Sequence, residues 1–557
     1  MSVNREPNGG GGRFQSGFWE PGFSCSRRDS MQLRALLLTI LAAVGSFAQS
    51  PVVDLGYAQY RGAVSSANFA HFLGIRYAAA PIGDLRFRGP QPPANISGVQ
   101  DATTQPNQCF QSSSGLSPTN PLATRAVVSD EDCLFLNVYY PSDTAGLPPK
   151  DLPVLVWIHG GGYLGGQASA YNGDDILKQS NRNLVLVIIQ YRLGVFGFLP
   201  GSKVKQNGAL NAGLLDQDAA LRWVNRHITK FGGDPAKVTI WGESAGAGSV
   251  LQQVVANNGQ TKPQLFRGAI TSSTFLPSQY KYNDRIPELI FSQVVSQLNC
   301  TTASNTMACL RAADANALET VNDNLNHGAF WGTFLLVPVI DGTFIRQRPT
   351  LSLAQGKVNG KVLLSVTNTF EGDVFVDQNS AAIANATQYA LNLFPEIQPA
   401  QADKAGRLYS ELGTPILQEN AIQAESIFIC PTYYMLNAFR GRSYKAEFAV
   451  PRGQHGADVA YYYPTLSTPT FQNQAFINAF AQIFTSFAIS LNPNVDVDPA
   501  NPTITPQWKV WMQGLGETEM LFNKTETNEP VVHTIETGQA LLQRCAFWDS
   551  VGAFTAQ

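Results

Sequence analysis

Five short runs of β-branched and large apolar residues constrain the fold of this chain more than any other feature. They show little alternation of apolar and polar residues, so they are typical of strands buried on both faces, as in a parallel sheet. The predicted strands are residues 153–159, 184–192, 237–241, 361–367 and 444–450.

Helical patterns lie between these strands. In residues 216–233, apolar residues recur at helical spacing, Asp216 is the predicted N-cap, and two glycines end the helix. Residues 245–255 form a second predicted helix. Strands that alternate with helices predict an α/β fold, with a large, mostly parallel central sheet flanked by helices.

Glycines or polar side chains follow four of the predicted strands. In chain order they are Gly160–Gly162, Ser244, Glu371 and His455. Because ligands of parallel sheets bind beyond the carboxyl ends of the strands, these residues are expected to meet in one site.

The segment G-E-S-A-G around Ser244 has the pattern of a nucleophilic serine on a sharp strand-to-helix turn, and no other serine of the chain fits G-x-S-x-G. A serine hydroxyl needs a base, and the base needs a partner that fixes its tautomer. We predict that Ser244 is a nucleophile, His455 its base and Glu371 the acid. N–H groups of Gly161, Gly162 and Ala245 are the predicted oxyanion hole.

Other residues compete for two of these roles. With the chain order serine, acid, histidine, the histidines after Ser244 are His327, His455 and His533, and of these His455 closely follows a buried strand. We expect His159 to shape the glycine loop and His227 to lie on a helix surface.

The acid also has rivals. Glu371 directly follows a predicted strand, whereas Asp341 lies in a predicted turn and Asp373 stands two residues further on. Glu243, beside the nucleophile, is expected to be a hydrogen-bonded structural carboxylate and not a proton-transfer group.

Composition and charge exclude several classes of function. With 38 Lys and Arg against 41 Asp and Glu, the chain of 557 residues has a net charge of −3 and no basic stripe, so we expect no nucleic-acid partner. No cysteine lies in a C-x-x-C pair, so we expect no metal, and we expect no cofactor.

The amino-terminal region is predicted to be a targeting segment. Residues 31–48 combine a positive charge, a short apolar run and small residues at Ser46 and Ala48, as in a cleaved signal peptide, and the run is too short for a membrane anchor. We interpret residues 1–30 as a disordered extension and 49–557 as a single domain of a secreted protein.

In a secreted protein, the cysteines are expected to form disulfide bonds and the sequons to carry glycans. An even number of cysteines in an oxidising compartment predicts three disulfide bonds, whose pairing the sequence leaves open. The cysteines are Cys109, Cys133, Cys300, Cys309, Cys430 and Cys545, and the sequons begin at Asn95, Asn299, Asn385 and Asn523.

Nine segments resemble the type-B carboxylesterase/lipase family, the cholinesterase-like branch of the α/β hydrolases, and in particular its secreted fungal members. The matches run in order through the chain from about residue 51 to residue 550. They are EDCLFLNVY (131–139), HGGGY (159–163), YRLGVFGFL (191–199), GLLDQDAALRWV (213–224), FGGDP (231–235), GESAG (242–246), PVIDG (338–342), NTFEGD (368–373) and QHGAD (454–458).

The resemblance implies an α/β-hydrolase fold in which insertions form the substrate pocket, and the same triad and oxyanion hole. It also implies that Ser273 supports the acid. The implied disulfide bonds are Cys109–Cys133, Cys300–Cys309 and Cys430–Cys545.

The substrate is expected to be a small-molecule or lipid ester. Residues 110–132 carry no Trp, which choline-specific relatives use to bind a quaternary ammonium, and no clear helical stripe like that of a lipase lid. We therefore expect a broad esterase; a lipase or sterol esterase is one alternative, and a catalytically inactive adhesion or scaffold homologue is another. The oligomeric state stays open.

Overall fold

The computed structural model describes residues 50–112, 129–143 and 145–557. The predicted extension and signal peptide, and most of the segment between Cys109 and Cys133, lie outside these residues. Among the described residues, no helix is long and apolar enough to cross a membrane.

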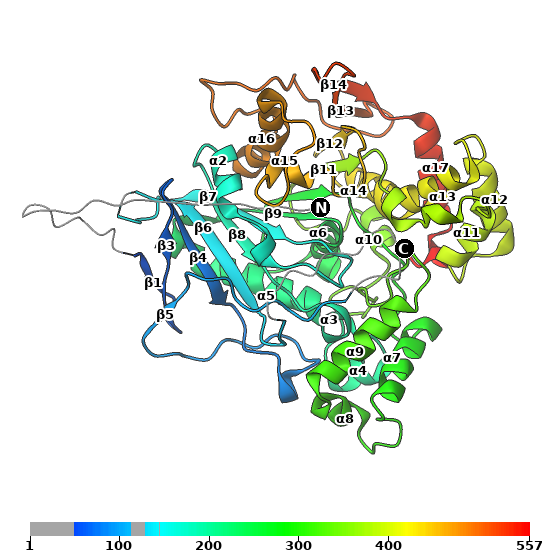
Figure 1. Ribbon diagram of the computed structural model, residues 1–557, viewed down its shortest axis with the longest axis horizontal. Coiled ribbons are helices and arrows are strands. Elements are labelled where there is room, and N and C mark those ends of the chain that lie inside the picture. The colour runs from blue at the N-terminus through cyan, green and yellow to red at the C-terminus, as the bar shows by residue number, and fades with distance from the viewer. Residues whose placement is uncertain (1–49, 113–128, 144) are drawn as a thin grey trace, which may run out of the picture. The chain divides into compact units, whose positions relative to one another are not determined.

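Within the described residues, eleven strands form one sheet in the order β14-β13-β12-β11-β10-β9-β7-β8-β6-β4-β3 (Figure 1). The strands from β8 to β13 run parallel, and antiparallel strands flank them on both sides. The strands are β3 Ala63–Val64, β4 Phe69–Arg76, β6 Phe135–Pro141, β7 Leu152–Ile158, β8 Val185–Ile189, β9 Gly233–Glu243, β10 Gly268–Ser272, β11 Val362–Asn368, β12 Ser443–Phe448, β13 Thr518–Lys524 and β14 Pro530–Glu536.

The five predicted strands all lie in this sheet, as β7, β8, β9, β11 and β12. The large, mostly parallel sheet with flanking helices is thus confirmed. A smaller sheet is formed by β1 Val52–Asp54, β2 Gln59–Arg61 and β5 Val99–Asp101.

Side chains of β7 show why its sequence lacks alternation. Val154 and Val156 belong to the hydrophobic cluster on one face of the sheet, and Leu155 and Trp157 belong to the cluster on the other. Both faces are therefore covered, as expected for strands without a polar side.

Helices cover these faces. Helix α6 (Ala245–Val255) packs on β7, β9 and β10, whereas α2 (Gly173–Gln179) and α16 (Gln474–Ser490) pack against each other and also contact the sheet. The other helices are α3 Gly194–Phe198, α4 Ser202–Asn207, α5 Ala212–His227, α7 Arg285–Gln297, α8 Thr306–Ala312, α9 Ala315–His327, α10 Pro349–Ala354, α11 Ala386–Leu393, α12 Pro399–Tyr409, α13 Pro415–Ala424, α14 Cys430–Ala438, α15 Val459–Tyr462, α17 Gln539–Ser550 and α18 Gly552–Thr555.

Two expectations about α5 are wrong. The helix starts at Ala212, so Asp216 lies inside it, fully buried, where it accepts hydrogen bonds from Arg192 at 2.7 and 2.8 Å instead of capping the helix. His227 is buried and not on the surface, because its ring packs against Tyr57 and Trp223, and burial lowers its pKa to about 4.

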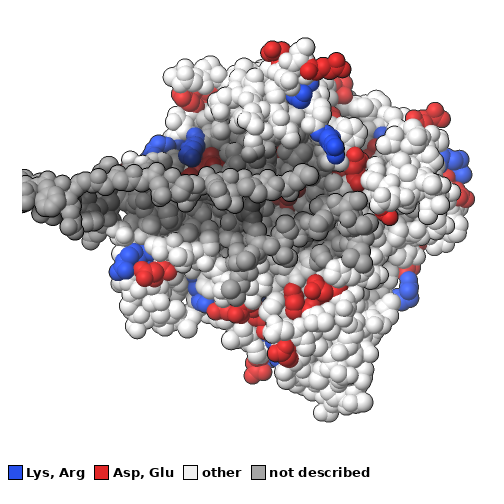
Figure 2. All heavy atoms as spheres, viewed as in Figure 1, with Lys and Arg blue, Asp and Glu red and all other residues white. Residues whose placement is uncertain are grey.

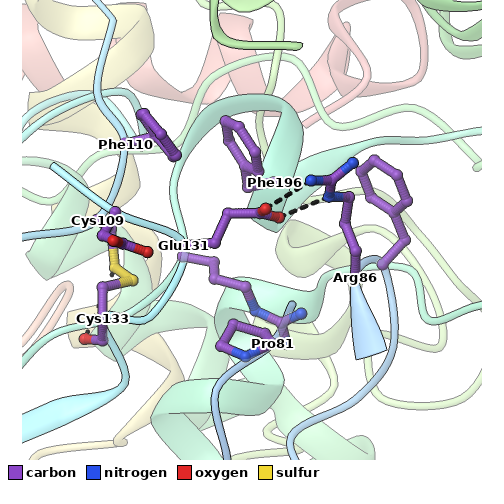
Figure 3. A pocket seen from close by; sticks show the side chains of 10 residues that line it. Pro81, Arg86, Cys109, Phe110, Glu131, Cys133 and Phe196 are labelled. Carbon is purple, nitrogen blue, oxygen red and sulfur yellow. Dashed lines mark hydrogen bonds and ion pairs between the residues drawn. A yellow bond between two sulfur atoms is a disulfide. The ribbon is translucent and has the colours of Figure 1, made fainter. Parts of the chain in front are cut away.

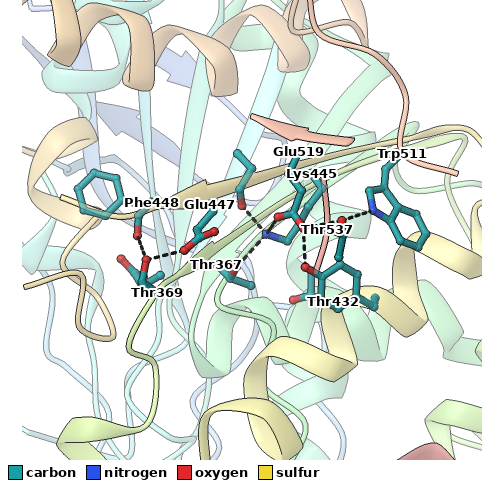
Figure 4. Close-up of polar contacts among 12 residues, drawn as sticks. Thr367, Thr369, Thr432, Lys445, Glu447, Phe448, Trp511, Glu519 and Thr537 are labelled. Carbon is teal, nitrogen blue, oxygen red and sulfur yellow. Dashed lines mark hydrogen bonds and ion pairs between the residues drawn. The ribbon is translucent and has the colours of Figure 1, made fainter. Parts of the chain in front are cut away.

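A buried ion pair ties together the strands next to the predicted site (Figure 4). Lys445 Nζ on β12 donates to Glu519 Oε2 on β13 at 2.8 Å and to Thr367 Oγ1 on β11 at 2.8 Å. The Glu519 carboxylate also accepts from Tyr433 and Thr537 at 2.7 and 2.6 Å. Because β12 leads into the segment that carries His455, this network holds the strand that precedes the predicted catalytic base.

We predict that Lys445→Met lowers the free energy of unfolding by about 3–5 kcal/mol, because it leaves a buried carboxylate without its counter-charge. Thermal or urea unfolding measures the change. The matched control is Arg61→Met, which removes the exposed ion pair with Asp101 and should cost less than about 1 kcal/mol. Equal effects of the two substitutions would contradict the role given to Lys445.

Candidate active site

Ser244 occupies a sharp turn between β9 and α6. Its backbone has φ 56° and ψ −124°, and it directly precedes the first residue of the helix. At Gly246, a Cβ would collide with the carbonyl oxygen of Ile158, so the chain can turn this tightly only with glycine there. The turn holds the serine at the carboxyl end of the central strand, as the G-x-S-x-G pattern predicts.

The imidazole of His455 contacts the Glu371 carboxylate. Nδ1 and Glu371 Oε2 are 2.5 Å apart, and Glu371 is completely buried. Neither Asp373 nor Asp341 is among the hydrogen-bond partners of His455 in the described part of the chain; Asp341 accepts from backbone amides of its own turn. The contact orients the ring and leaves Nε2 as the free nitrogen.

Neighbouring strands hold the acid in place. Ser273 Oγ, just after β10, donates to Glu371 Oε1 at 2.6 Å, and the backbone N–H of Asn368 donates to the same oxygen at 2.7 Å. The Asn368 side chain continues to Asp458 at 3.0 Å, and burial raises the pKa of Asp458 to about 6. Ser273 therefore holds the Glu371 carboxylate, as the family resemblance implies. Asn368 and Asp458 belong to the motifs NTFEGD and QHGAD, but the sequence does not show that the two side chains meet.

The second nitrogen of His455 faces another carboxylate. Nε2 lies 3.4 Å from Glu243 Oε1 and has no hydrogen-bond partner among the described residues. Burial raises the pKa of Glu243 to about 8; His455 opposes this shift, and Asp458 and Glu371 add to it. The expectation of a hydrogen-bonded structural carboxylate is not met, because no hydrogen bond to the Glu243 side chain occurs within the described chain.

The glycine loop after β7 packs directly on the serine turn. A Cβ at Gly160 would lie 3.0 Å from Ser244 Cβ and 2.7 Å from Glu243 Oε2. Gly161 and Gly162 have φ values of 105° and 65°, which favour glycine. His159 is buried, its Nδ1–H donates to Gly160 O at 3.0 Å, and burial lowers its pKa to about 4, so it shapes the loop as expected.

Aromatic rings enclose one side of the histidine. The rings of Phe428 and Phe375 lie 4.5 and 4.9 Å from that of His455, and Phe334 packs next to Phe375. Phe334, Phe375 and Phe428 lie outside the motifs of the sequence, so no short motif identified them.

Cys109 and Cys133 line a small pocket together with Arg86 and Glu131 (Figure 3). The two cysteines form a disulfide bond, and Arg86 makes two hydrogen bonds of 2.6 Å to Glu131 beside it. Cys300–Cys309 and Cys430–Cys545 are also bonded, so the structure has the three pairs that the resemblance implies.

The remaining predicted residues lie elsewhere. His533 is exposed on β14, and His327 is exposed at the end of α9. Of the sequon asparagines, Asn95, Asn299 and Asn385 are exposed and Asn523 is half-buried.

The fold and this arrangement are those of an α/β hydrolase. Residues 49–548 match the model of the carboxylesterase family, and the chain belongs to that family.

Individual relatives agree. "Secreted lipase 1" of Botryotinia fuckeliana is 34% identical over 355 residues, 59% of this chain and 61% of the relative. "Carboxylesterase patB" of Penicillium expansum is 28% identical over 90% of this chain and 96% of its own length. The crystal structure of Aspergillus niger EstA superposes with a TM-score of 0.79 at 30% identity, over 91% of this chain and 99% of that one. The chain thus spans less than two thirds of the Botryotinia lipase but nearly all of the other two.

The charges around His455 predict the pH dependence of any reaction that uses it as a base. Burial disfavours the charged ring, but Glu371, its hydrogen bond, Glu243 and Asp458 outweigh this and raise the pKa of His455. Since a base must be neutral, kcat/KM for an ester should rise with pH through a pKa above the ordinary value of about 6.5.

Glu371→Gln should move this ascending limb to lower pH and reduce the rate, whereas Glu526→Gln, at an exposed position of the β13–β14 hairpin, should leave the profile unchanged. Initial rates between pH 5 and 9 measure both. An ascending limb at the same pH in wild type and Glu371→Gln would contradict the assignment.

Proposed function

We propose that this protein is a secreted serine carboxylic ester hydrolase of broad specificity. It would act through Ser244, His455 and Glu371 and form an acyl-enzyme intermediate. The observation that carries the proposal is the hydrogen bond of His455 to a fully buried Glu371, with Ser244 held on the adjacent strand-to-helix turn. Membership of the carboxylesterase family supports it.

The reaction has two acyl transfers. His455 Nε2 takes the proton of Ser244 Oγ as the oxygen attacks the ester carbonyl, and the carbonyl oxygen becomes an oxyanion. The N–H groups of Gly161, Gly162 and Ala245 would stabilise this charge, each by roughly 3 kcal/mol. Nε2 then protonates the leaving alcohol. Water attacks the acyl group on Ser244 by the same route, and the carboxylic acid product leaves. Glu371 stabilises the imidazolium through its hydrogen bond to Nδ1.

Secretion belongs to the same proposal. A signal peptide at residues 31–48 would be removed, and residues 49–557 would remain as one domain with glycans at the exposed sequons. Relatives named as secreted lipases support this. Amino-terminal sequencing of protein collected from culture medium tests it.

We predict that a fluorophosphonate labels Ser244, and that Ser244→Ala abolishes labelling and lowers kcat at least about 10⁴-fold without unfolding the protein. Mass spectrometry of the labelled peptide and activity assays measure this. Ser292→Ala, at an exposed serine of α7, is the control and should label normally. Absence of any adduct in the wild type would favour an inactive adhesion or scaffold homologue instead.

A lipase or sterol esterase is the second candidate, since the similar Botryotinia fuckeliana protein is named as a lipase. We expect soluble p-nitrophenyl butyrate to be hydrolysed with a higher kcat/KM than emulsified long-chain triglyceride. Rates on both substrates, below and above the solubility limit, measure this preference. A strong rise in rate on formation of the emulsion would decide for the lipase.

A further inference from the structure

A cavity of about 640 Å³ lies beside the candidate active site. Its wall includes Gly160 and Gly161 of the glycine loop and Glu243 next to the nucleophile. A molecule bound at Ser244 would therefore extend directly into it.

Helix α9 supplies a second, distant part of the wall. Glu319, Asp323 and His327 recur every four residues, so they lie on one face of the helix, and all three line the cavity. Two carboxylates at this spacing repel each other. Burial and the charge of Asp323 raise the pKa of Glu319 to about 8. A positive group between them would relieve the repulsion.

An independent observation at the same cavity comes from Gln108. This side chain is 7% exposed, and its Nε2 donates to Ser129 Oγ at 2.9 Å. Its Oε1 is buried without a hydrogen-bond partner in the described part of the chain. Because an unsatisfied buried acceptor is destabilising, a ligand that donates a hydrogen bond to Gln108 Oε1 would be favoured.

The wall is rich in carboxylates, and among its described residues only His327 can carry a positive charge. Among the described residues that line the cavity there are three carboxylates and no Lys or Arg. On the outer face in Figure 2, by contrast, blue and red side chains are scattered among uncharged ones. The cavity thus offers carboxylate and amide oxygens to a cationic hydrogen-bond donor.

The geometry also indicates which half of an ester reaches the cavity. Nε2 of His455, the atom that would protonate the leaving alcohol, lies 3.4 Å from Oε1 of Glu243, which is part of the wall. The aromatic rings of Phe375 and Phe428 pack against the same imidazole. The alcohol half would therefore leave along the carboxylate wall.

We propose that this cavity binds a protonated amine on the alcohol half of the substrate, with Glu319 and Asp323 as its specificity-determining residues. The inference rests on the proposed ester hydrolysis. A primary ammonium carries three N–H donors for carboxylate and amide oxygens, whereas a quaternary ammonium carries none. The recognition thus differs from the aromatic binding of choline.

The test compares two esters of nearly equal shape at pH 8. They are 4-(aminomethyl)phenyl butyrate, which is protonated, and neutral 4-ethylphenyl butyrate. We expect the wild-type protein to favour the amine in kcat/KM, and the double variant Glu319→Gln, Asp323→Asn to lose about tenfold of this preference through KM, because charge-assisted hydrogen bonds are lost. Hydrolysis of the neutral ester should be unchanged.

The charge-matched control is Glu526→Gln, Glu536→Gln on the exposed β13–β14 hairpin, which should keep the wild-type preference. An unchanged ratio in the α9 double variant, or an equal loss in the control, would overturn the inference while ester hydrolysis stands. If neither ester is hydrolysed, the proposed function fails. Calorimetric binding of 4-(aminomethyl)phenol to the wild type and the double variant then tests the cavity by itself. Weaker binding by the variant supports the inference, and equal binding overturns it.

Discussion

The contact between His455 and Glu371 is the interaction on which the rest of the site depends. The two side chains stand 84 residues apart in sequence and meet at 2.5 Å because β11 and β12 run parallel and end at the same edge of the sheet. Pairing continues past the strands, where Phe370 bridges to Gln454, so the backbone beside each residue is fixed as well. The buried Lys445–Glu519 pair extends this order to β13.

Three carboxylates surround one imidazole, and this concentration of negative charge sets the chemistry. Glu371 contacts one ring nitrogen and Glu243 faces the other. Asp458 accepts a hydrogen bond from Asn368, and its charge also raises the pKa of His455. Since burial alone would keep the histidine neutral, these groups are what make its charged form accessible. Burial raises the pKa of Glu243 and of Asp458, so the site does not have to hold three full negative charges at neutral pH.

Strand runs and short motifs predicted much of this from the sequence. The five apolar runs all became strands of the sheet, and the residues after them lie at its carboxyl edge. The prediction failed where burial depends on distant partners. Asp216 has the residue type of an N-cap, yet it pairs with Arg192 inside α5, and His227 is covered by Tyr57 and Trp223. Arg192 and Tyr57 lie outside α5 in the sequence, whereas Trp223 lies one helical turn before His227 on α5 itself.

The sequence by itself determined the strands of the sheet, the serine turn, and the positions of Glu371 and His455 just after their strands, because each of these is encoded in a few neighbouring residues. Tertiary structure alone decided what surrounds the reacting atoms. It brought Asn368 and Asp458 to the Glu371 carboxylate, packed Phe375 and Phe428 on the His455 ring, and placed one face of α9 on the cavity that Glu243 also lines. These residues come from separate segments of the chain, and their meeting depends on how those segments pack on the sheet, which local sequence spacing does not show.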